Sequence, residues 1–242
     1  MGKPIIAQRK GKGSPAYASP SHRFVARISY PTFFTSLQTP LRGQVLEFLD
    51  DPGHGPLLAD VLLENGKNFY TLASEGMQVG GEVSVGPGSK LSLGNIVPIS
   101  SLVEGTPIYN VELRPGDGGK FARTSGAVAY IATKDEEKNT VEIRLASRQV
   151  KTLLGNCLAT IGIACGGGKK EKPFKKAGNK MRAMLAVGRE WPKVRRSAMS
   201  AYNHPFGGKS FGKPTSVARS TPPGRKVGHI ASRRTGRRKG IE

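Results

Sequence analysis

Residues 203–210, late in the chain, differ at only one position from the sequence motif of a nucleotide-binding loop. A P-loop begins with glycine, ends in Gly-Lys-Ser or Gly-Lys-Thr, and follows a β-strand. Gly208, Lys209 and Ser210 satisfy the end of this pattern, but Asn203 occupies the first position and no strand pattern precedes it. We therefore reject nucleotide binding. Gly207 and Gly208 lack a Cβ, so their N–H groups could approach an RNA phosphate closely.

His204, inside the same segment, is the residue that could do proton chemistry. A general base needs a partner that orients its imidazole, and the Gly- and Pro-rich surroundings offer no rigid element. The ring could instead stack on a base or donate a hydrogen bond to a phosphate. We favour RNA packing or turn structure over catalysis.

Two cysteines and one further histidine could suggest a metal site. Structural zinc sites use four ligands in close pairs, whereas Cys157 and Cys165 lie eight positions apart with no Cys-x-x-Cys motif. We expect buried core thiols and no metal. His54, within Asp-Pro-Gly-His-Gly, is expected to be a turn residue, with a phosphate contact as the alternative.

Arg123 is the most informative single residue of the central region. It precedes Thr-Ser-Gly in a turn, and a guanidinium can pair with phosphate through two parallel hydrogen bonds. The alternative is an exposed arginine at the start of a strand. Arg42 and Arg148 carry the same expectation more weakly.

The charge of the chain is concentrated at its two ends. Of the formal net charge of +21, residues 166–242 contribute +18 and residues 1–27 contribute +6, while residues 28–165 carry −3. Basic segments of this kind repel themselves until a polyanion neutralises them. Sparse aromatic residues among them, Trp191, Tyr202, Phe206 and Phe211, suit stacking on splayed bases.

This distribution predicts phosphate contacts along both ends of the chain. Together with Arg42, Arg123, Arg148, His204, Gly207 and Gly208, the candidate RNA-binding residues are Arg9, Lys10, Lys12, Arg23, Lys175, Lys176, Lys180, Arg182, Lys193, Arg195, Arg196, Lys209, Arg233 and Arg234.

Composition also argues against other classes of protein. Two cysteines are too few for a disulfide scaffold and suggest a reducing cytosol. No apolar run approaches the ~18 residues of a membrane span, and the basic ends contain too much Gly and Pro for a membrane-surface helix. We find no dinucleotide fingerprint and no paired acid and base, so we expect no cofactor and no enzymatic activity.

Strand patterns fill the middle of the chain. The first group covers residues 43–49, 57–64 and 68–73, with one more strand expected in 76–94; Asn65-Gly66 is typical of a two-residue hairpin turn. The second group covers residues 107–113, 126–133, 140–145, 150–154 and 158–164. Short strands without crossover helices predict two small all-β barrels in series. One helix is expected around residues 179–187.

Several short sequence motifs, which follow one another in a constant order, resemble those of a known family. Arg42-Gly43-Gln44-Val45, Asn110-Val111-Glu112-Leu113-Arg114-Pro115-Gly116, Cys157-Leu158-Ala159-Thr160-Ile161-Gly162 and His204-Pro205 are among them. Over residues 5–235 the chain resembles the universal large-subunit ribosomal protein two family. The short form with a basic N-terminal arm looks archaeal-type.

The resemblance implies four parts: a basic N-terminal arm (1–35), an OB-like barrel (36–88), an SH3-like barrel (89–165) and a basic extension (166–242) that penetrates large-subunit rRNA. Fully extended, the last part would reach roughly 250 Å. The implied function is that of a cytoplasmic ribosomal protein near the peptidyl-transferase region that supports subunit joining and tRNA placement. Neighbouring ribosomal proteins, and small-subunit rRNA at a subunit bridge, are the further partners implied.

The chain departs from the bacterial form of the family around His204. Arg196 replaces a glycine, Ser200-Ala201 replace an Asn-Pro pair, Asn203 replaces an aspartate and Phe206 replaces a second histidine. These changes remove the groups that an Asp–His or His–His arrangement would need. We therefore expect a non-enzymatic rRNA-binding protein. The alternatives are an RNA-modifying enzyme with a binding barrel and a general nucleic-acid packaging protein.

Overall fold

The computed structural model describes residues 2–169, 171–209 and 215–233, and the chain divides into two compact units. One, the sheet unit, comprises Ser21–Pro173. The other, the basic unit, joins Met1–Pro20 to Phe174–Glu242. The two strongly basic ends of the sequence thus belong largely to one unit.

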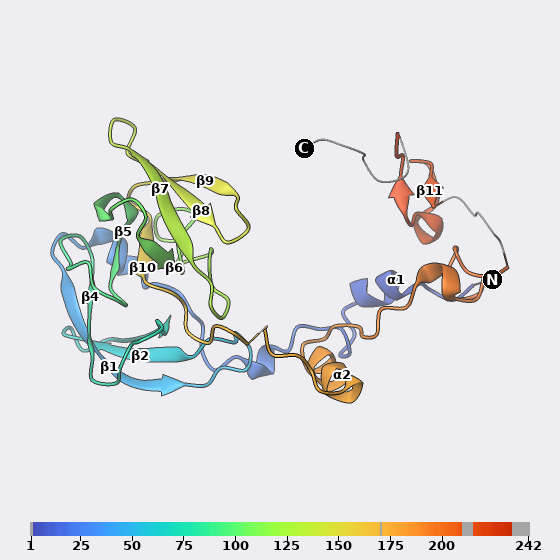
Figure 1. The fold of residues 1–242 in the computed structure, drawn as a ribbon, viewed down its shortest axis with the longest axis horizontal. Helices are drawn as coiled ribbons and strands as arrows, with labels where there is room; N and C mark the ends of the chain where they lie inside the picture. Colours follow the sequence, from blue (N-terminus) through green and yellow to red (C-terminus); the bar gives the residue numbers. More distant parts are fainter. Residues whose placement is uncertain (1, 170, 210–214, 234–242) are drawn as a thin grey trace. The chain divides into compact units, whose positions relative to one another are not determined.

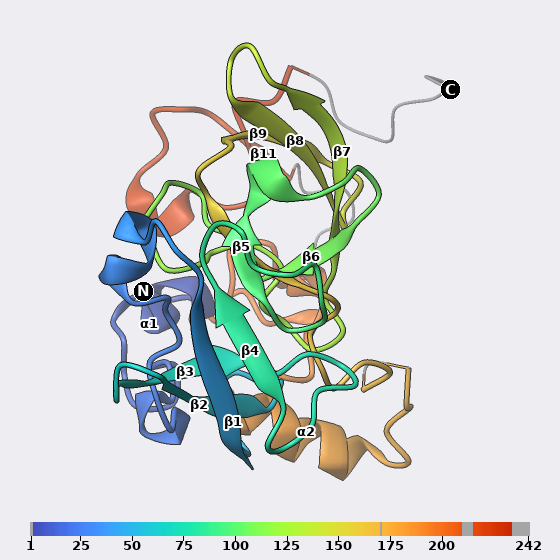
Figure 2. The same cartoon turned by 90° about the vertical axis from the view of Figure 1, so that its left-hand side faces the viewer.

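A ten-stranded sheet organises the sheet unit (Figure 1). Its spatial order is β3-β2-β1-β4-β5-β10-β6-β7-β8-β9, and Figure 2 shows β1, β4 and β5 side by side. The expected all-β fold is confirmed. The strands are β1 (Leu41–Leu49), β2 (Leu58–Leu63), β3 (Asn68–Leu72), β4 (Glu82–Val85), β5 (Ile96–Pro98), β6 (Pro107–Tyr109), β7 (Ala129–Asp135), β8 (Thr140–Leu145), β9 (Val150–Leu154) and β10 (Leu158–Ile161).

Two of the three buried apolar clusters of the sheet unit lie on either side of a shared wall made of β5 and β10; the third contains Ile28, Leu58, Leu72, Tyr109 and Ala164. Successive side chains of a strand point to opposite faces. Ile96 and Leu158 accordingly belong to the first core, with Val45 and Val61 among its members, whereas Val97 and Ala159 belong to the second. Sequence patterning missed β5, because three residues are too few to show alternation.

The hairpin between β2 and β3 has a different turn from the one expected. The Leu63 N–H donates to Lys67 O and the Gly66 N–H donates to Leu63 O, so three residues form the loop. Only Gly66 has a positive φ, of 76°, which is typical of a turn followed by a glycine bulge. The two-residue turn was therefore wrong, although the Asn-Gly signal located the hairpin.

Residues 21–35 pack with the sheet unit, although the sequence assigned them to a basic arm. They contain the short 3₁₀ helices η1 (Ser21–Arg23) and η2 (Thr32–Ser36). Tyr30 and Phe34 are buried in the first core, and the Tyr30 hydroxyl donates to Asn110 O at 2.8 Å. Isolated apolar residues in a Pro-rich stretch carry no periodic signal, so their burial could not be read from pattern.

The basic unit consists of short elements in extended chain. The predicted helix is present as α2 (Ala177–Ala186), two residues earlier than expected at its start, and a short helix α1 (Ile6–Gly11) was missed. The remaining elements are η4 (Arg196–Ala198), η5 (Pro223–Arg225) and the parallel pair β11 (Ser216–Val217) and β12 (His229–Ile230). Within the described ranges no helix has the length and apolarity to cross a membrane.

Candidate nucleic-acid interface

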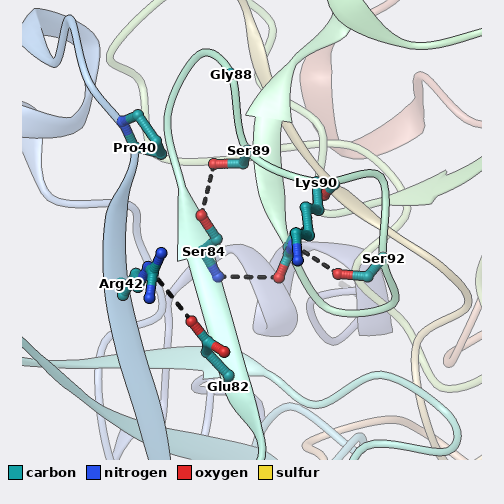
Figure 3. Close-up of a pocket in the computed structure, with 9 residues that line it drawn as sticks. Pro40, Arg42, Glu82, Ser84, Gly88, Ser89, Lys90 and Ser92 are labelled. Carbon is teal, nitrogen blue, oxygen red and sulfur yellow. Dashed lines mark hydrogen bonds and ion pairs between the residues drawn. The ribbon is translucent and has the colours of Figure 1, made fainter.

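Arg42 lies on β1 at the rim of a small polar pocket of about 240 Å³ (Figure 3). Its Nε is 3.6 Å from Glu82 Oε1 on β4, and both side chains are well exposed. Beside them the hydroxyls of Ser84 and Ser89 are hydrogen-bonded at 2.8 Å. An exposed ion pair of this length holds Arg42 only weakly, so its guanidinium can turn to a phosphate.

Asn95 builds the other wall of this pocket. Its Oδ1 accepts from the Ser84 N–H, and its Nδ2 donates to Ser92 Oγ and to Lys90 O. Lys90 lines the same pocket and was missed by sequence reasoning. The signal was available in Gly-Pro-Gly-Ser-Lys, where a lysine follows a glycine-rich turn.

Arg123 is engaged by the protein itself. Its Nη1 donates to Gly119 O at 3.0 Å and its Nη2 donates to Ile28 O at 2.9 Å. Burial lowers the pKa of this guanidinium below its ordinary value. The guanidinium that was expected to bind a phosphate thus connects the backbone at residues 28 and 119. Any RNA contact must use the N–H groups of Arg123 that these two hydrogen bonds leave.

The other arginines of the sheet unit are placed differently. Arg148 is exposed in the turn between β8 and β9 with a positive φ of 66°, which an L-residue adopts at a cost. Arg23 ends η1. Arg23, Arg42 and Arg148 therefore lie in three different elements or turns of the sheet unit.

The N-terminal cations of the basic unit lie on or beside α1. Arg9 and Lys10 fall in its last turn and Lys12 caps it. Lys10 Nζ is 2.9 Å from Glu190 Oε2, and it also lies 5.8 Å from the centre of the Tyr17 ring. All three cations are exposed, and Lys10 is in addition partly neutralised within the unit.

A second group of cations surrounds α2. Lys175 precedes the helix, Lys176 is its N-cap, and Lys180 and Arg182 lie within it. Lys180 Nζ lies 5.7 Å from the centre of the half-buried Trp191 ring. No side chain of α2 is fully buried. Its cations and its apolar residues are thus both open to a partner.

His204 is buried in a compact turn of the basic unit. Its Nδ1 accepts from the Phe206 N–H at 3.1 Å, its own N–H donates to Ser200 O, and its ring contacts the Phe206 ring edge to face. Burial, together with the charge of Arg196, lowers the pKa of the imidazole. A neutral, 7 % exposed ring held in this way shapes a turn.

Gly207 and Gly208 are needed by the same turn. A Cβ on Gly207 would lie inside van der Waals contact of the Ser200 and Met199 carbonyl oxygens, and Gly208 has a φ of 94°. Glycine here is thus explained by the protein's own backbone. The close approach to an RNA phosphate expected at these positions stays a prediction.

The remaining candidates are distributed along extended chain. Lys193, Arg195, Lys209 and Arg233 are exposed. Arg196 is half-buried, and its Nη1 has no hydrogen-bond partner among the described residues. Arg234 and the aromatic Phe211 lie outside the described residues.

One of the two cysteines is the buried core thiol that was expected, and the other is only partly buried. Cys157 is fully buried, and burial raises its pKa to about 11. Cys165 is partly buried, and burial likewise raises its pKa. Among the described residues there is no group of three or more His, Cys, Asp and Glu side chains placed to hold a metal ion.

Comparison with known proteins places the chain among ribosomal proteins. Residues 92–226 match the family described as Ribosomal Proteins L2, C-terminal domain. Proteins named large ribosomal subunit protein uL2 match nearly the whole chain. The chain is 46 % identical to that of Natronomonas pharaonis over 98 % of this chain and 97 % of the relative.

Two further relatives have the same name. The Methanothermobacter thermautotrophicus protein is 46 % identical over 99 % of this chain and 100 % of its own length. The Methanopyrus kandleri protein is 47 % identical over 98 % of each chain. Identity at this level over both full lengths leaves no large segment unmatched, so the chain belongs to the large ribosomal subunit protein uL2 family.

Proposed function

We propose that this chain is a structural constituent of the large ribosomal subunit, where it binds rRNA and neighbouring ribosomal proteins. The observation that carries the proposal is the 44–47 % identity to archaeal uL2 proteins over nearly the full length. The basic unit supports it physically, because exposed cations along extended chain suit a folded polyanion.

The finer proposal is a position near the peptidyl-transferase region, with support of subunit association, including small-subunit rRNA at a bridge, and of tRNA placement. It rests on the family resemblance of residues 199–208. The buried, neutral His204 supports a non-enzymatic role for this segment. The proposed location is the cytoplasmic large subunit.

Sedimentation of a cell extract tests the proposal most directly. The protein should travel with the large subunit and the joined ribosome and be released by high salt, because phosphate neutralisation is salt-dependent. Sedimentation with chromatin, or only with free protein, would contradict it. Filter binding provides a second test: rRNA fragments should compete better than duplex DNA, whereas a packaging protein would bind both.

A further inference from the structure

A second pocket of the sheet unit, of about 540 Å³, is lined by residues from 21–29 together with His54, Lys120 and Arg123. Its floor is aromatic. The Phe24 ring meets the His54 ring edge to face with 4.5 Å between centroids, and 38 % of Phe24 stays exposed. A Cβ on Gly53 would lie 2.5 Å from Phe24 Cδ1, so glycine at this position lets the ring rest on the turn.

Asp51 fixes the histidine of this floor. Its carboxylate is fully buried and accepts from the Gly53 N–H at 2.8 Å and from His54 Nδ1. Because a carboxylate only accepts, Nδ1 carries a hydrogen and Nε2 is the ring nitrogen left for a ligand. Neutral imidazole would accept there from the exocyclic amine of a base, and imidazolium would donate.

Cations complete the walls of the pocket. Arg27 and Lys120 are exposed and line it, and Arg123 forms part of the wall through its hydrogen bonds to Ile28 O and Gly119 O. Aromatic rings stack on bases, and lysine and arginine neutralise phosphates. A free phosphate would not use the Phe24 ring, and an apolar peptide would not use three cations.

We propose that this pocket binds a single RNA nucleotide turned out of its helical stack, with the base against Phe24 and the phosphate at Lys120 and Arg27. The proposal rests on the proposed function and assigns it a specific contact point. Its volume lies within the range of sites for small organic ligands, and unstacked nucleotides are the form in which proteins read RNA most specifically.

Phe24→Ala in the full-length protein tests the aromatic floor. Tyr130→Ala is the matched control, because Tyr130 is 37 % exposed and carries a cation, Arg144, 6.0 Å from its ring centre. Filter binding to large-subunit rRNA should be weakened about fivefold to tenfold by Phe24→Ala and less than about twofold by the control. Phe24→Leu, which keeps apolar packing on Gly53 without an aromatic face, should weaken binding nearly as much.

Lys120→Gln tests the phosphate contact, with exposed Lys151→Gln on β9 as its control. Loss of one phosphate contact should reduce the slope of log affinity against log salt by about one. A salt dependence of Lys120→Gln equal to that of the wild-type protein would contradict the proposed nucleotide pocket. An rRNA affinity unchanged in both Phe24 variants would also contradict it. Neither result would contradict rRNA binding by the protein as a whole. Failure of the wild-type protein to prefer rRNA over duplex DNA would instead overturn the proposed function.

Discussion

Two charged side chains of the sheet unit, those of Glu112 and Arg123, hold loops by hydrogen bonds to backbone atoms. Glu112 is fully buried and accepts from the N–H groups of Gly116, Gly118 and Leu158 at 3.0–3.2 Å. Arg123 donates to two carbonyl oxygens of other segments. Charge-assisted bonds of this kind are stronger than neutral ones, so both residues stabilise the backbone segments to which they bond, and those of Arg123 include the Ile28 wall of the proposed pocket.

Arg123→Ala should therefore destabilise the sheet unit. It leaves two carbonyl groups without their donor, and we expect the free energy of unfolding to fall by about 1–3 kcal/mol. Urea denaturation of the variant and the parent measures this loss, with Arg148→Ala as a control at an exposed turn. Unchanged stability with weakened rRNA binding would show that Arg123 acts mainly on phosphate.

Asp51→Asn should destabilise the protein in a pH-dependent way. Burial alone would raise the pKa of Asp51, but hydrogen bonds from His54 and Gly53 outweigh it and hold the pKa below its ordinary value. Stability from the carboxylate is thus fully present above the unfolded pKa of about 3.9 and is lost as pH falls through the lower folded pKa. The gap in unfolding free energy between parent and variant should narrow from pH 7 toward pH 3. A constant gap would contradict this account.

Among the secondary-structure elements, the strands predicted most accurately from the sequence are the longer ones, in which apolar and polar residues alternate. β8 and β9 were predicted to the residue, because Val141, Ile143 and Leu145 alternate with polar neighbours and charged tips bound the hairpin. β5 escaped because it has three residues, and α1 because a six-residue helix lacks a periodic face. Sequence patterning detects an element only when its periodic arrangement of apolar and polar residues repeats, and a three-residue strand or a six-residue helix is too short for that.

The roles of residues in the candidate site were also only partly predictable from the sequence, because the fold determines their partners. Sequence identified Arg123 and Gly207 as special, but assigned their chemistry to RNA. The structure gives each a partner within the chain: Ile28 O for Arg123, ninety-five residues away, and Ser200 O for Gly207. Such partners are fixed by tertiary contacts, so residue type alone could not distinguish a phosphate contact from a backbone contact.

Gly207→Ala should disturb the turn of residues 199–208 more than loss of the imidazole does. The added Cβ meets two carbonyl oxygens, whereas His204→Gln keeps an acceptor for the Phe206 N–H. Incorporation of tagged protein into large subunits measures the effect. We expect a severalfold loss for Gly207→Ala, little for His204→Gln, and none for the control Gly178→Ala in α2, where a Cβ meets nothing within 4 Å. Equal incorporation of all three would contradict the role of the turn.

For the whole molecule, the division into units predicts where the free protein resists proteolysis. Tyr30 and Phe34 lie in the first core and residues 21–173 form one compact unit. A broad-specificity protease acting on the full chain should leave a fragment that begins between residues 20 and 28 and ends near residue 173. A fragment of 36–165 would instead match the boundaries that the sequence suggested.

Tyr30→Ala tests the cause of that boundary. The hydroxyl of Tyr30 bonds to Asn110 O at 2.8 Å and to Thr160 Oγ1 at 2.6 Å, so it joins the N-terminal segment to β10 and to the chain after β6. Without the ring and its hydroxyl, residues 21–35 lose one buried core side chain and two hydrogen bonds, and cleavage should move toward residue 36 while the sheet survives. Phe33→Ala, which removes a half-buried ring from the same segment, is the control. Mass spectrometry of the protected fragments gives the cleavage site in both variants. If the fragment of Tyr30→Ala begins at the same residue as that of the parent protein, other contacts hold the segment.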